Sequence, residues 1–140
     1  MIKFRSMMRD AELMKSQMHN ERTDGPLFKI KNDPRITKSG KWIRRWSIDE
    51  FPQILNVISG DMSFIGPRPH LPDEVEKYSE KQRQVLTIKP GITGMAQVYG
   101  RDTNSFDREI ELDLFYIENW SLLLDTKILI LTFRAVFQGK

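Results

Sequence analysis

The sequence has 140 residues and no cysteine, which excludes a disulfide scaffold, a thiolate metal site and a cysteine nucleophile. Hydrophobic residues make up 39%, which with glycine is near the value for an ordinary globular chain and argues against a disordered tail or a polytopic membrane protein. The net charge of +3 is uneven, because residues 1–45 hold 12 Lys and Arg against 5 Asp and Glu. This basic front part favours either an anionic partner or a solvated charged face.

The length indicates one domain over residues 1–140. At its start, residues 2–7 alternate as a half-buried strand does, and residues 10–19 carry apolar side chains at the spacing of a short amphipathic helix. Turn residues follow at 23–26, and residues 27–30 are expected to form a short strand.

A second turn at 32–35 leads into a helix expected over residues 37–45, with Thr37 as its N-cap. Ser47 and Glu50 then have the spacing of a capping box at the start of a further helix, which Gly60 would end. Pro52 conflicts with this assignment because proline inside a helix lacks a donor and clashes with the preceding turn. Either the helix kinks at Pro52, or it begins near Pro52.

The second half predicts more helix than strand. Residues 62–69 are a short apolar stretch that ends in a stiff loop, residues 72–86 read as a charged helix, and a glycine-rich section begins at Pro90. Residues 106–119 are amphipathic, and residues 120–137 are so apolar that they indicate either a core helix or a helix at a membrane interface. The predicted fold is therefore α+β, a helix-rich single domain with short strands or a hairpin and amphipathic membrane-surface helices.

Asp49 and Glu50 are the most informative pair of residues. At a helix start, the positive end of the helix dipole favours their ionised forms. An ionised Asp is a competent nucleophile towards phosphorus, and two carboxylates with substrate phosphates suit Mg²⁺. The alternative is that these acids only stabilise a first helical turn.

A second feature is an arginine held between two prolines, Pro67-Arg68-Pro69. The prolines stiffen the backbone and so fix the direction of Arg68, whose guanidinium binds phosphate in a bidentate fork. Other cations lie near turns or element ends, and together with the carboxylate pair they would form a site for a nucleoside diphosphate. These cations include Lys3, Arg5, Arg44, Arg45, Lys89 and Arg101. Taken singly, each is better explained as a surface charge.

Several motifs occur in one order along the whole chain: Lys-Phe-Arg-Ser-Met at 3–7, Ser-Ile-Asp-Glu at 47–50, the stretch from Gly60 to Pro69, Lys-Pro-Gly-Ile-Thr-Gly at 89–94, and Glu-Leu-Asp at 111–113 with Tyr116. In this combination the sequence closely resembles the catalytic domain of the bacterial sugar transferases, the monotopic polyprenyl-phosphate phosphoglycosyl transferases.

The resemblance implies transfer of a sugar-1-phosphate from a UDP-sugar to undecaprenyl phosphate, with release of UMP, at the cytoplasmic face of the bacterial inner membrane. This reaction initiates assembly of exopolysaccharide, capsule, O-antigen or other glycans. Family members use Mg²⁺ and a covalent phosphosugar intermediate on the Asp of the Asp-Glu pair, and larger members form homodimers.

Carried over by motif, Asp49 would be the nucleophile, and Glu50 would hold the metal with it or handle the acceptor's proton. The residues expected to bind substrate lie in the opening segment, ahead of the Asp-Glu pair, in the proline-flanked loop and in the glycine-rich section. They are Lys3, Arg5, Arg44, Pro67, Arg68, Pro69 and Arg101.

Family members carry a membrane-inserted helix just before the Lys-Phe-Arg motif, and this sequence begins at that motif. We therefore expect a catalytic domain without its anchor, and we expect this to favour a soluble form and to reduce activity. The alternative function is a non-catalytic basic module that binds an anionic membrane surface or nucleic acid through residues 1–45. Aromatic residues are too scattered there for a nucleic-acid platform, so no nucleic-acid partner is expected.

Overall fold

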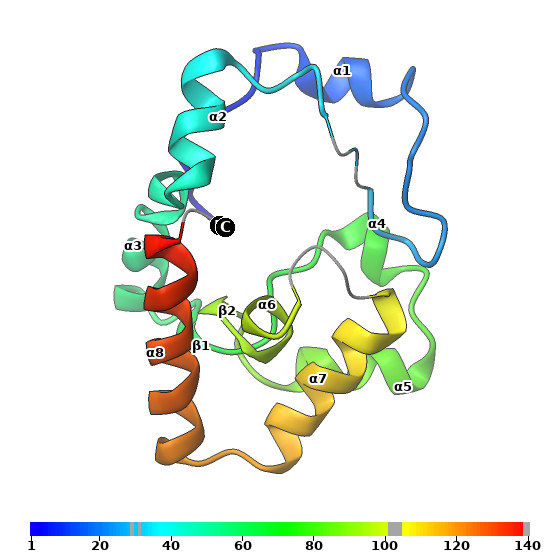
Figure 1. Cartoon of the computed structure of the whole chain (residues 1–140). Helices are drawn as coiled ribbons and strands as arrows, with labels where there is room; N and C mark the ends of the chain where they lie inside the picture. Colours follow the sequence, from blue (N-terminus) through cyan, green and yellow to red (C-terminus); the bar gives the residue numbers. More distant parts are fainter. Residues whose placement is uncertain (29, 31, 101–104, 139–140) are drawn as a thin grey trace.

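The computed structural model describes residues 1–28, 30, 32–100 and 105–138 (Figure 1). In the first half, the helices are α1 (Ala11–Lys15), α2 (Lys38–Arg45), the 3₁₀ helix η1 (Ile48–Glu50) and α3 (Gln53–Ile58). In the second half, they are α4 (Pro72–Val75), α5 (Glu80–Arg83), the 3₁₀ helix η2 (Gln84–Thr87), α6 (Met95–Val98), α7 (Phe106–Glu118) and α8 (Leu122–Phe137). The chain is helix-rich α+β, as predicted.

The sheet described by the structure consists of two short parallel strands, β1 (Ser63–Ile65) and β2 (Gly91–Thr93). Ser63 pairs with Gly91 and Ile65 with Thr93. Because parallel neighbours need a long crossover, the chain between them carries α4, α5 and η2. The strands are therefore not the hairpin that the sequence suggested.

Two buried apolar clusters hold the second half together. The first joins the turn before α2 to α4, η2 and α7, and consists of Leu27, Tyr78, Val85, Phe106, Ile110 and Leu114. The second joins β1 to the end of α7 and to α8, and consists of Ile65, Tyr116 and Ile128, with Met95, Val98 and Leu124 packed against it. Helix α7 contributes to both clusters, so it is the central element of the core.

The helices expected over residues 37–45, 106–119 and 120–137 are confirmed as α2, α7 and α8. The Thr37 hydroxyl oxygen accepts a hydrogen bond from the Gly40 N–H at 3.0 Å, which confirms Thr37 as the N-cap. Helix α1 is shorter than the expected range of 10–19.

The strand expected over residues 2–7 is wrong, because its backbone partners do not form one continuous strand. The Phe4 N–H donates to the Asp49 carbonyl at 3.0 Å, whereas Met7 forms an isolated antiparallel bridge with Ile36. The strand expected over residues 27–30 is absent among its described residues. The single helix expected over residues 72–86 is divided by Ser79, whose hydroxyl caps the start of α5.

The capping box proposed at Ser47 and Glu50 is also wrong. Ser47 has a left-handed backbone (φ 53°), and its side chain makes no capping hydrogen bond. Residues 48–50 form a single 3₁₀ turn, and α3 starts directly after Pro52. The structure thus follows the alternative in which the helix begins near Pro52, because a proline fits before a helix but not inside it.

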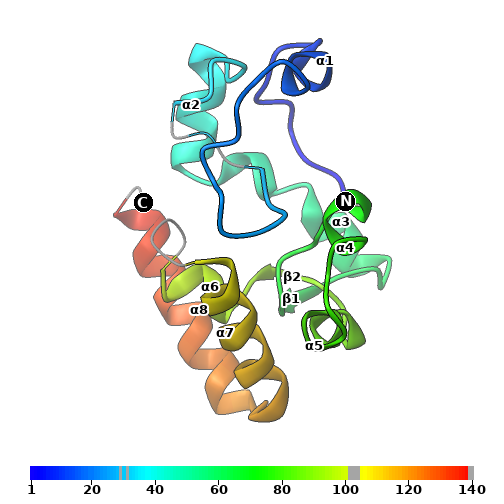
Figure 2. The same cartoon turned by 90° about the vertical axis from the view of Figure 1, so that its right-hand side faces the viewer.

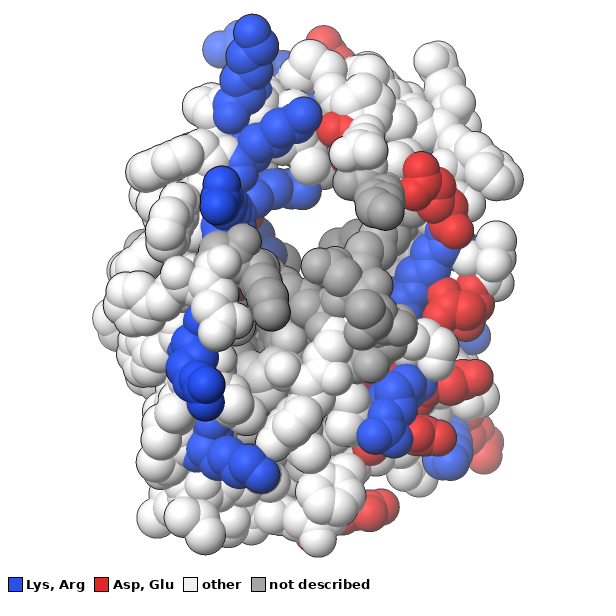
Figure 3. Space-filling model, viewed as in Figure 1, with Lys and Arg blue, Asp and Glu red and all other residues white. Residues whose placement is uncertain are grey.

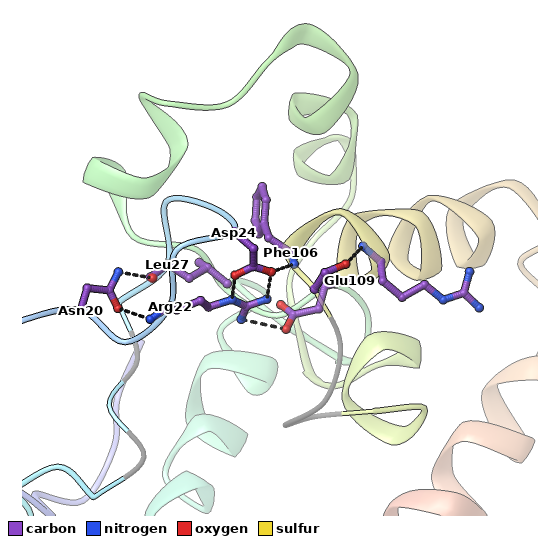
Figure 4. Close-up of polar contacts among 8 residues, drawn as sticks. Asn20, Arg22, Asp24, Leu27, Phe106 and Glu109 are labelled. Carbon is purple, nitrogen blue, oxygen red and sulfur yellow. Dashed lines mark hydrogen bonds and ion pairs between the residues drawn. The ribbon is translucent and has the colours of Figure 1, made fainter.

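A polar contact joins the start of α7 to the loop that precedes α2 (Figure 4). Asp24 Oδ2 accepts a hydrogen bond from the Phe106 N–H at 2.5 Å, and Asp24 Oδ1 lies 2.8 Å from Arg22 Nε. Arg22 Nη1 also reaches Glu109 Oε1 at 3.0 Å. Hydrogen bonds from Arg22 hold the pKa of Asp24 below its usual value.

Replacing Asp24 with Ala is expected to lower the free energy of unfolding by about 1 kcal/mol, because the N–H at the start of α7 loses its acceptor. Urea denaturation of the Asp24→Ala variant measures this effect. Asp73→Ala is a suitable control, since Asp73 is exposed and, in the described structure, makes no ion pair. Equal stability of the two variants would contradict the assigned role of Asp24.

Helices α2, α3 and α8 form a layer along one edge of the molecule (left in Figure 1), and the turned view shows the strands between α8 and α3 (Figure 2). This layer exposes large apolar side chains, with exposed fractions of 60% for Trp42, 77% for Ile58 and 81% for Leu123. The same edge is mostly white in Figure 3, with Lys and Arg beside it. Over the residues searched, no helix is long and apolar enough to cross a membrane.

Candidate active site

The Asp49 and Glu50 pair lies in the 3₁₀ turn between α2 and α3. Lys3 Nζ lies 3.1 Å from Glu50 Oε1, and the hydrogen bond from the Phe4 N–H to the Asp49 carbonyl fixes the amino-terminal segment beside this turn. The structure therefore brings Lys3 together with both predicted carboxylates, although they are 46 or more positions apart in the sequence.

Asp49 is unusual because it is only 8% exposed, yet its carboxylate makes no hydrogen bond or ion pair with any described residue. The Asp49 oxygens are not among the fully buried side-chain atoms that lack a partner, so solvent reaches the carboxylate. The role of Asp49 as nucleophile or metal ligand stays a prediction.

Arg44 and Arg5 lie on the two segments that flank this turn. Arg44, in the last turn of α2, donates from Nε to the Ser6 hydroxyl at 2.8 Å, and Ser6 is buried. The hydrogen bond leaves the other guanidinium nitrogens of Arg44 open to an anion. Arg5 is exposed and makes no ion pair within the described part of the chain.

The loop with Arg68 follows directly from β1 and is held against β2. The Gly66 N–H donates to the Thr93 carbonyl at 2.9 Å, and the Gly91 N–H donates to the Pro67 carbonyl at 2.8 Å. A Cβ atom at Gly94 would lie 2.1 Å from the Gly66 carbonyl oxygen, so only glycine permits this approach. Pro67 is fully buried and Pro69 is half-buried, and the stiffness expected from the two prolines stays a prediction.

Arg68 lies near the buried face of α7, where its charge acts on His70, Tyr78 and Asp113. Burial raises the pKa of Asp113 to about 7, although a hydrogen bond from the Ala96 backbone and the Arg68 charge act in the opposite direction. The described structure shows no hydrogen bond or ion pair between Arg68 and Asp49. Arg68 is thus placed near a second set of titratable groups.

His70 is one of these groups, and the sequence analysis did not single it out as a site residue. Its Nδ1 is hydrogen-bonded to the Tyr78 hydroxyl, and its Nε2 is buried without a partner in the described structure. Burial, and secondly the Arg68 charge, lower the pKa of His70 to about 4. The imidazole is therefore neutral at pH 7.

The lowered pKa of His70 predicts a pH effect on stability. Between pH 6.5 and pH 4 the unfolded chain binds a proton at this position and the folded chain does not, so acidification through this range destabilises the fold. From pH 7 to pH 5 the cost is about 2 kcal/mol. Asp113 has the opposite sign, because its raised pKa favours the folded state on acidification.

The contribution of His70 is isolated by comparing the wild type with His70→Gln at both pH values. The wild type should lose about 2 kcal/mol more than the variant between pH 7 and pH 5, as measured by urea denaturation. Asp113 is present in both proteins, so its effect on the free energy of unfolding cancels in the comparison. An equal loss in both proteins would show that His70 titrates normally.

Gln53 and Asn56 were also missed as site residues. They follow Asp49 at four and seven positions, and all three are buried, with Gln53 at 2% and Asn56 at 6% exposure. Asn56 Nδ2 has no hydrogen-bond partner in the described structure. The sequence of α3 does contain a pattern that points to Gln53 and Asn56. These polar residues share one helix face, and the apolar residues occupy the other positions.

The predicted residues therefore form two groups. Lys3, Asp49 and Glu50 lie together, with Arg44 on the adjoining helix. Arg68 lies in the loop after β1, and Arg101 lies outside the described residues. Among the described residues, no three His, Asp or Glu side chains are grouped to hold a metal ion.

Comparison with known proteins gives consistent results. The family model described as "Bacterial sugar transferase" matches residues 1–139. Galactosyl transferase CpsE of Streptococcus agalactiae is 51% identical over 98% of this chain, which covers 31% of that protein. Undecaprenyl-phosphate galactose phosphotransferase of Salmonella typhimurium is 44% identical over 97% of the chain, which covers 30% of that protein.

A shorter relative, the exopolysaccharide production protein ExoY of Sinorhizobium fredii, is 39% identical over 96% of this chain, which covers 62% of that protein. The chain thus spans about a third of the length of the two longer relatives. Because the family model matches nearly every residue, and the motifs around Asp49 and Arg68 lie within the match, the chain belongs to the bacterial sugar transferase family.

Proposed function

We propose that this chain is a phosphoglycosyl transferase domain that moves a sugar-1-phosphate from a UDP-sugar to a polyprenyl phosphate through a covalent intermediate on Asp49. The observation that supports it best is Asp49, a largely buried residue whose carboxylate has no partner among the described residues and which lies next to the Lys3–Glu50 pair. The names of relatives support the lipid-phosphate acceptor, since two are undecaprenyl-phosphate sugar phosphotransferases.

In the first step, an Asp49 carboxylate oxygen attacks the phosphorus that carries the sugar. The bond from that phosphorus to the bridging oxygen breaks, UMP leaves, and the phosphosugar remains on Asp49 as an acyl phosphate. In the second step, a phosphate oxygen of the polyprenyl phosphate attacks the same phosphorus. The Asp49 carboxylate leaves, and the polyprenyl-diphosphate sugar is formed.

The cations around the turn suit the charge of these reactants. Lys3, Arg44 and Arg5 lie on segments that border Asp49, and a guanidinium or ammonium group stabilises the oxygens of a transferring phosphoryl group. Arg68 offers a further guanidinium from the loop after β1. Glu50 is held by Lys3 and would assist with the proton of an incoming acceptor.

The residues fit Mg²⁺ as the expected cofactor. Asp49 and Glu50 are adjacent carboxylates, Asp49 lacks a cation partner in the described structure, and Mg²⁺ commonly binds one or two carboxylates together with substrate phosphates. When bound, the ion would neutralise charge on the diphosphate.

UMP release tests the proposed reaction. The chain is incubated with Mg²⁺, a polyprenyl phosphate and UDP-glucose or UDP-galactose, and UMP is quantified by chromatography. Release of UMP together with a new polyprenyl-diphosphate sugar is expected. Release of UDP, or an unchanged lipid with every donor while UMP accumulates, would contradict the proposal.

The apolar layer of α2, α3 and α8 is proposed to lie on a membrane surface, which brings the site to the lipid acceptor. Apolar side chains face outwards, the buried face of α3 is polar, and basic side chains flank the layer, as in helices that lie in a headgroup plane. This location, at the cytoplasmic face of the bacterial inner membrane, is consistent with a family of lipid-linked sugar transferases.

Replacing both Leu55 and Ile58 with Glu should reduce binding to phospholipid vesicles at least tenfold, because two exposed apolar side chains become charged. Vesicle co-sedimentation measures the effect, and circular dichroism should be unchanged since neither side chain is buried. Gln84→Glu, an exposed position outside the layer, controls for the added negative charge. If the double variant bound vesicles as strongly as the Gln84→Glu protein, the membrane contact would have to lie outside α3.

A further inference from the structure

A pocket of about 310 Å³ opens between the start of the two strands and the end of α7. Its wall includes Ser63, Ile88, Lys89, Tyr116 and Trp120. The pocket combines a cation, a hydroxyl and an aromatic ring at one place on the surface. Lys89 is one of the cations that the sequence analysis grouped with the carboxylate pair, but Asp49, Glu50, Lys3, Arg44 and Arg68 do not line this pocket.

The aromatic wall of this pocket is fixed in position. Asp125 accepts hydrogen bonds from the Tyr116 hydroxyl at 2.8 Å and from Trp120 Nε1 at 3.2 Å. Both carboxylate oxygens of Asp125 are thereby used within the protein. The Trp120 ring, which is 59% exposed, is thus linked through Asp125 to the buried Tyr116.

Lys89 is the charged residue among those that line the pocket. It is exposed and makes no hydrogen bond or ion pair with the described residues. A Cβ atom placed on Gly60 would lie 3.8 Å from Lys89 Nζ, so the ammonium group lies beside the turn that follows α3. An ammonium group held there without a counterion suits an anionic ligand.

The pocket is separate from the Asp49 site. Ser63 and Gly91 are paired at the amino ends of the parallel strands, and Lys89 lies just before this pair, whereas the loop with Arg68 follows the carboxyl end of β1. Asp49 precedes α3, while Gly60, the neighbour of Lys89, follows it. Lys89 and the carboxylate pair therefore lie beside opposite ends of α3.

Exposed apolar residues line the pocket or are close in sequence to residues beside it. Ile58 precedes Gly60 and is 77% exposed, Ile88 is 37% exposed, and Leu123 follows Trp120 closely and is 81% exposed. These side chains belong to or adjoin the layer of α2, α3 and α8. The pocket thus has a cation and a hydroxyl within a rim suited to hydrocarbon, and a Trp where interfacial aromatic residues are commonly found.

We infer that this pocket binds the anionic headgroup of a bilayer phospholipid, with Lys89 on the phosphate and Trp120 at the interface. The inference rests on the membrane-surface part of the proposed function. It gives the domain a defined contact point that orients it on an anionic membrane, away from the reacting carboxylate.

The test compares vesicle binding of the full chain with that of Lys89→Gln and Lys127→Gln. Lys127 is an exposed lysine on α8 that does not line the pocket, so it is a matched control for general surface charge. Co-sedimentation is measured with vesicles of phosphatidylcholine alone and with vesicles that contain phosphatidylglycerol. The wild type should prefer phosphatidylglycerol, and Lys89→Gln should lose about fivefold of that preference.

A second measurement follows Trp120 fluorescence in a chain with Trp42→Phe and Trp46→Phe. Short-chain phosphatidylglycerol should give a saturable change that inorganic phosphate and short-chain phosphatidylcholine do not give. The proposal would be overturned if Lys89→Gln and Lys127→Gln lost the preference for phosphatidylglycerol to the same extent. It would also be overturned if inorganic phosphate changed Trp120 fluorescence as phosphatidylglycerol does. Binding to vesicles of phosphatidylcholine alone depends on the apolar layer and not on Lys89. This measurement therefore distinguishes failure of the headgroup proposal from failure of the proposed membrane surface.

Discussion

The Asp49→Asn variant is expected to lose at least three orders of magnitude in sugar-phosphate transfer. An amide at this position has nearly the same shape as the carboxylate but is a very weak nucleophile, so the first displacement stops. The substitution removes no hydrogen bond or ion pair of the described structure, so the fold should be retained. Transfer is measured as UMP release with a polyprenyl phosphate present.

Asp61→Asn is a suitable control for this experiment. Asp61 is an exposed carboxylate shortly after α3, and it accepts a hydrogen bond from the Ser59 hydroxyl at 2.7 Å. It should keep nearly full transfer activity. If Asp49→Asn also kept activity, Asp49 would not be the nucleophile, and Glu50 would have to be tested in the same way.

The Arg35→Ala variant is expected to show the largest loss of stability, about 3 kcal/mol. Arg35 is 5% exposed, and its Nη2 lies 2.6 Å from Asp33 Oδ2 while its Nη1 donates to the Ala11 carbonyl at 3.1 Å. Its guanidinium also lies over the Phe28 ring, 5.1 Å from the centroid. Removing Arg35 leaves the buried Asp33 carboxylate without its cation.

The same pair predicts a pH effect. Hydrogen bonds from Arg35 lower the pKa of Asp33, so the stability from this pair is present above the ordinary pKa of an Asp and is lost as the pH falls through the lowered value. Urea denaturation of wild type and Arg35→Ala measures both effects. Arg9→Ala, at an exposed position with no ion pair in the described structure, is the control. Similar stability of all three proteins would contradict the role of the pair.

Local signals predicted the elements that depend on neighbouring residues. Thr37 caps α2 through the nearby Gly40, and α7 has the periodic apolar face from Phe106 to Leu114 that reads as a helix. Ser79 and Gln82 also form a capping box that divides the expected helix over 72–86. That signal was present in the sequence and was overlooked because the surrounding residues all favour helix.

Elements that depend on distant partners could not be predicted. Residues 2–7 alternate like a strand, but their backbone groups pair with Asp49 and Ile36, which no local pattern indicates. The left-handed backbone at Ser47 likewise results from the entry into the 3₁₀ turn, since the sequence there fits a capping box equally well. At both positions the local sequence allowed more than one backbone conformation, and contacts with distant residues determined which one forms.

The candidate site shows the same division. The motifs and the family resemblance identified Asp49, Glu50, Lys3 and Arg68, and the structure places the first three together. The burial of Asp49, Gln53 and Asn56 on one face of the chain emerged only from the fold. In a soluble globular protein those positions would be apolar, so the inverted face could not be recognised before the exposed side of α3 was known.

The covalent intermediate tests the central claim most directly. The wild type and Asp49→Asn are mixed with Mg²⁺ and UDP-sugar without the lipid acceptor, quenched in acid and digested with a protease. Mass spectrometry of the peptide that contains Asp49 should show the added mass of one phosphosugar in the wild type and none in the variant. Addition of polyprenyl phosphate before the quench should remove the label. A labelled peptide elsewhere, or labelling of the Asn variant, would contradict a mechanism in which Asp49 carries the sugar phosphate.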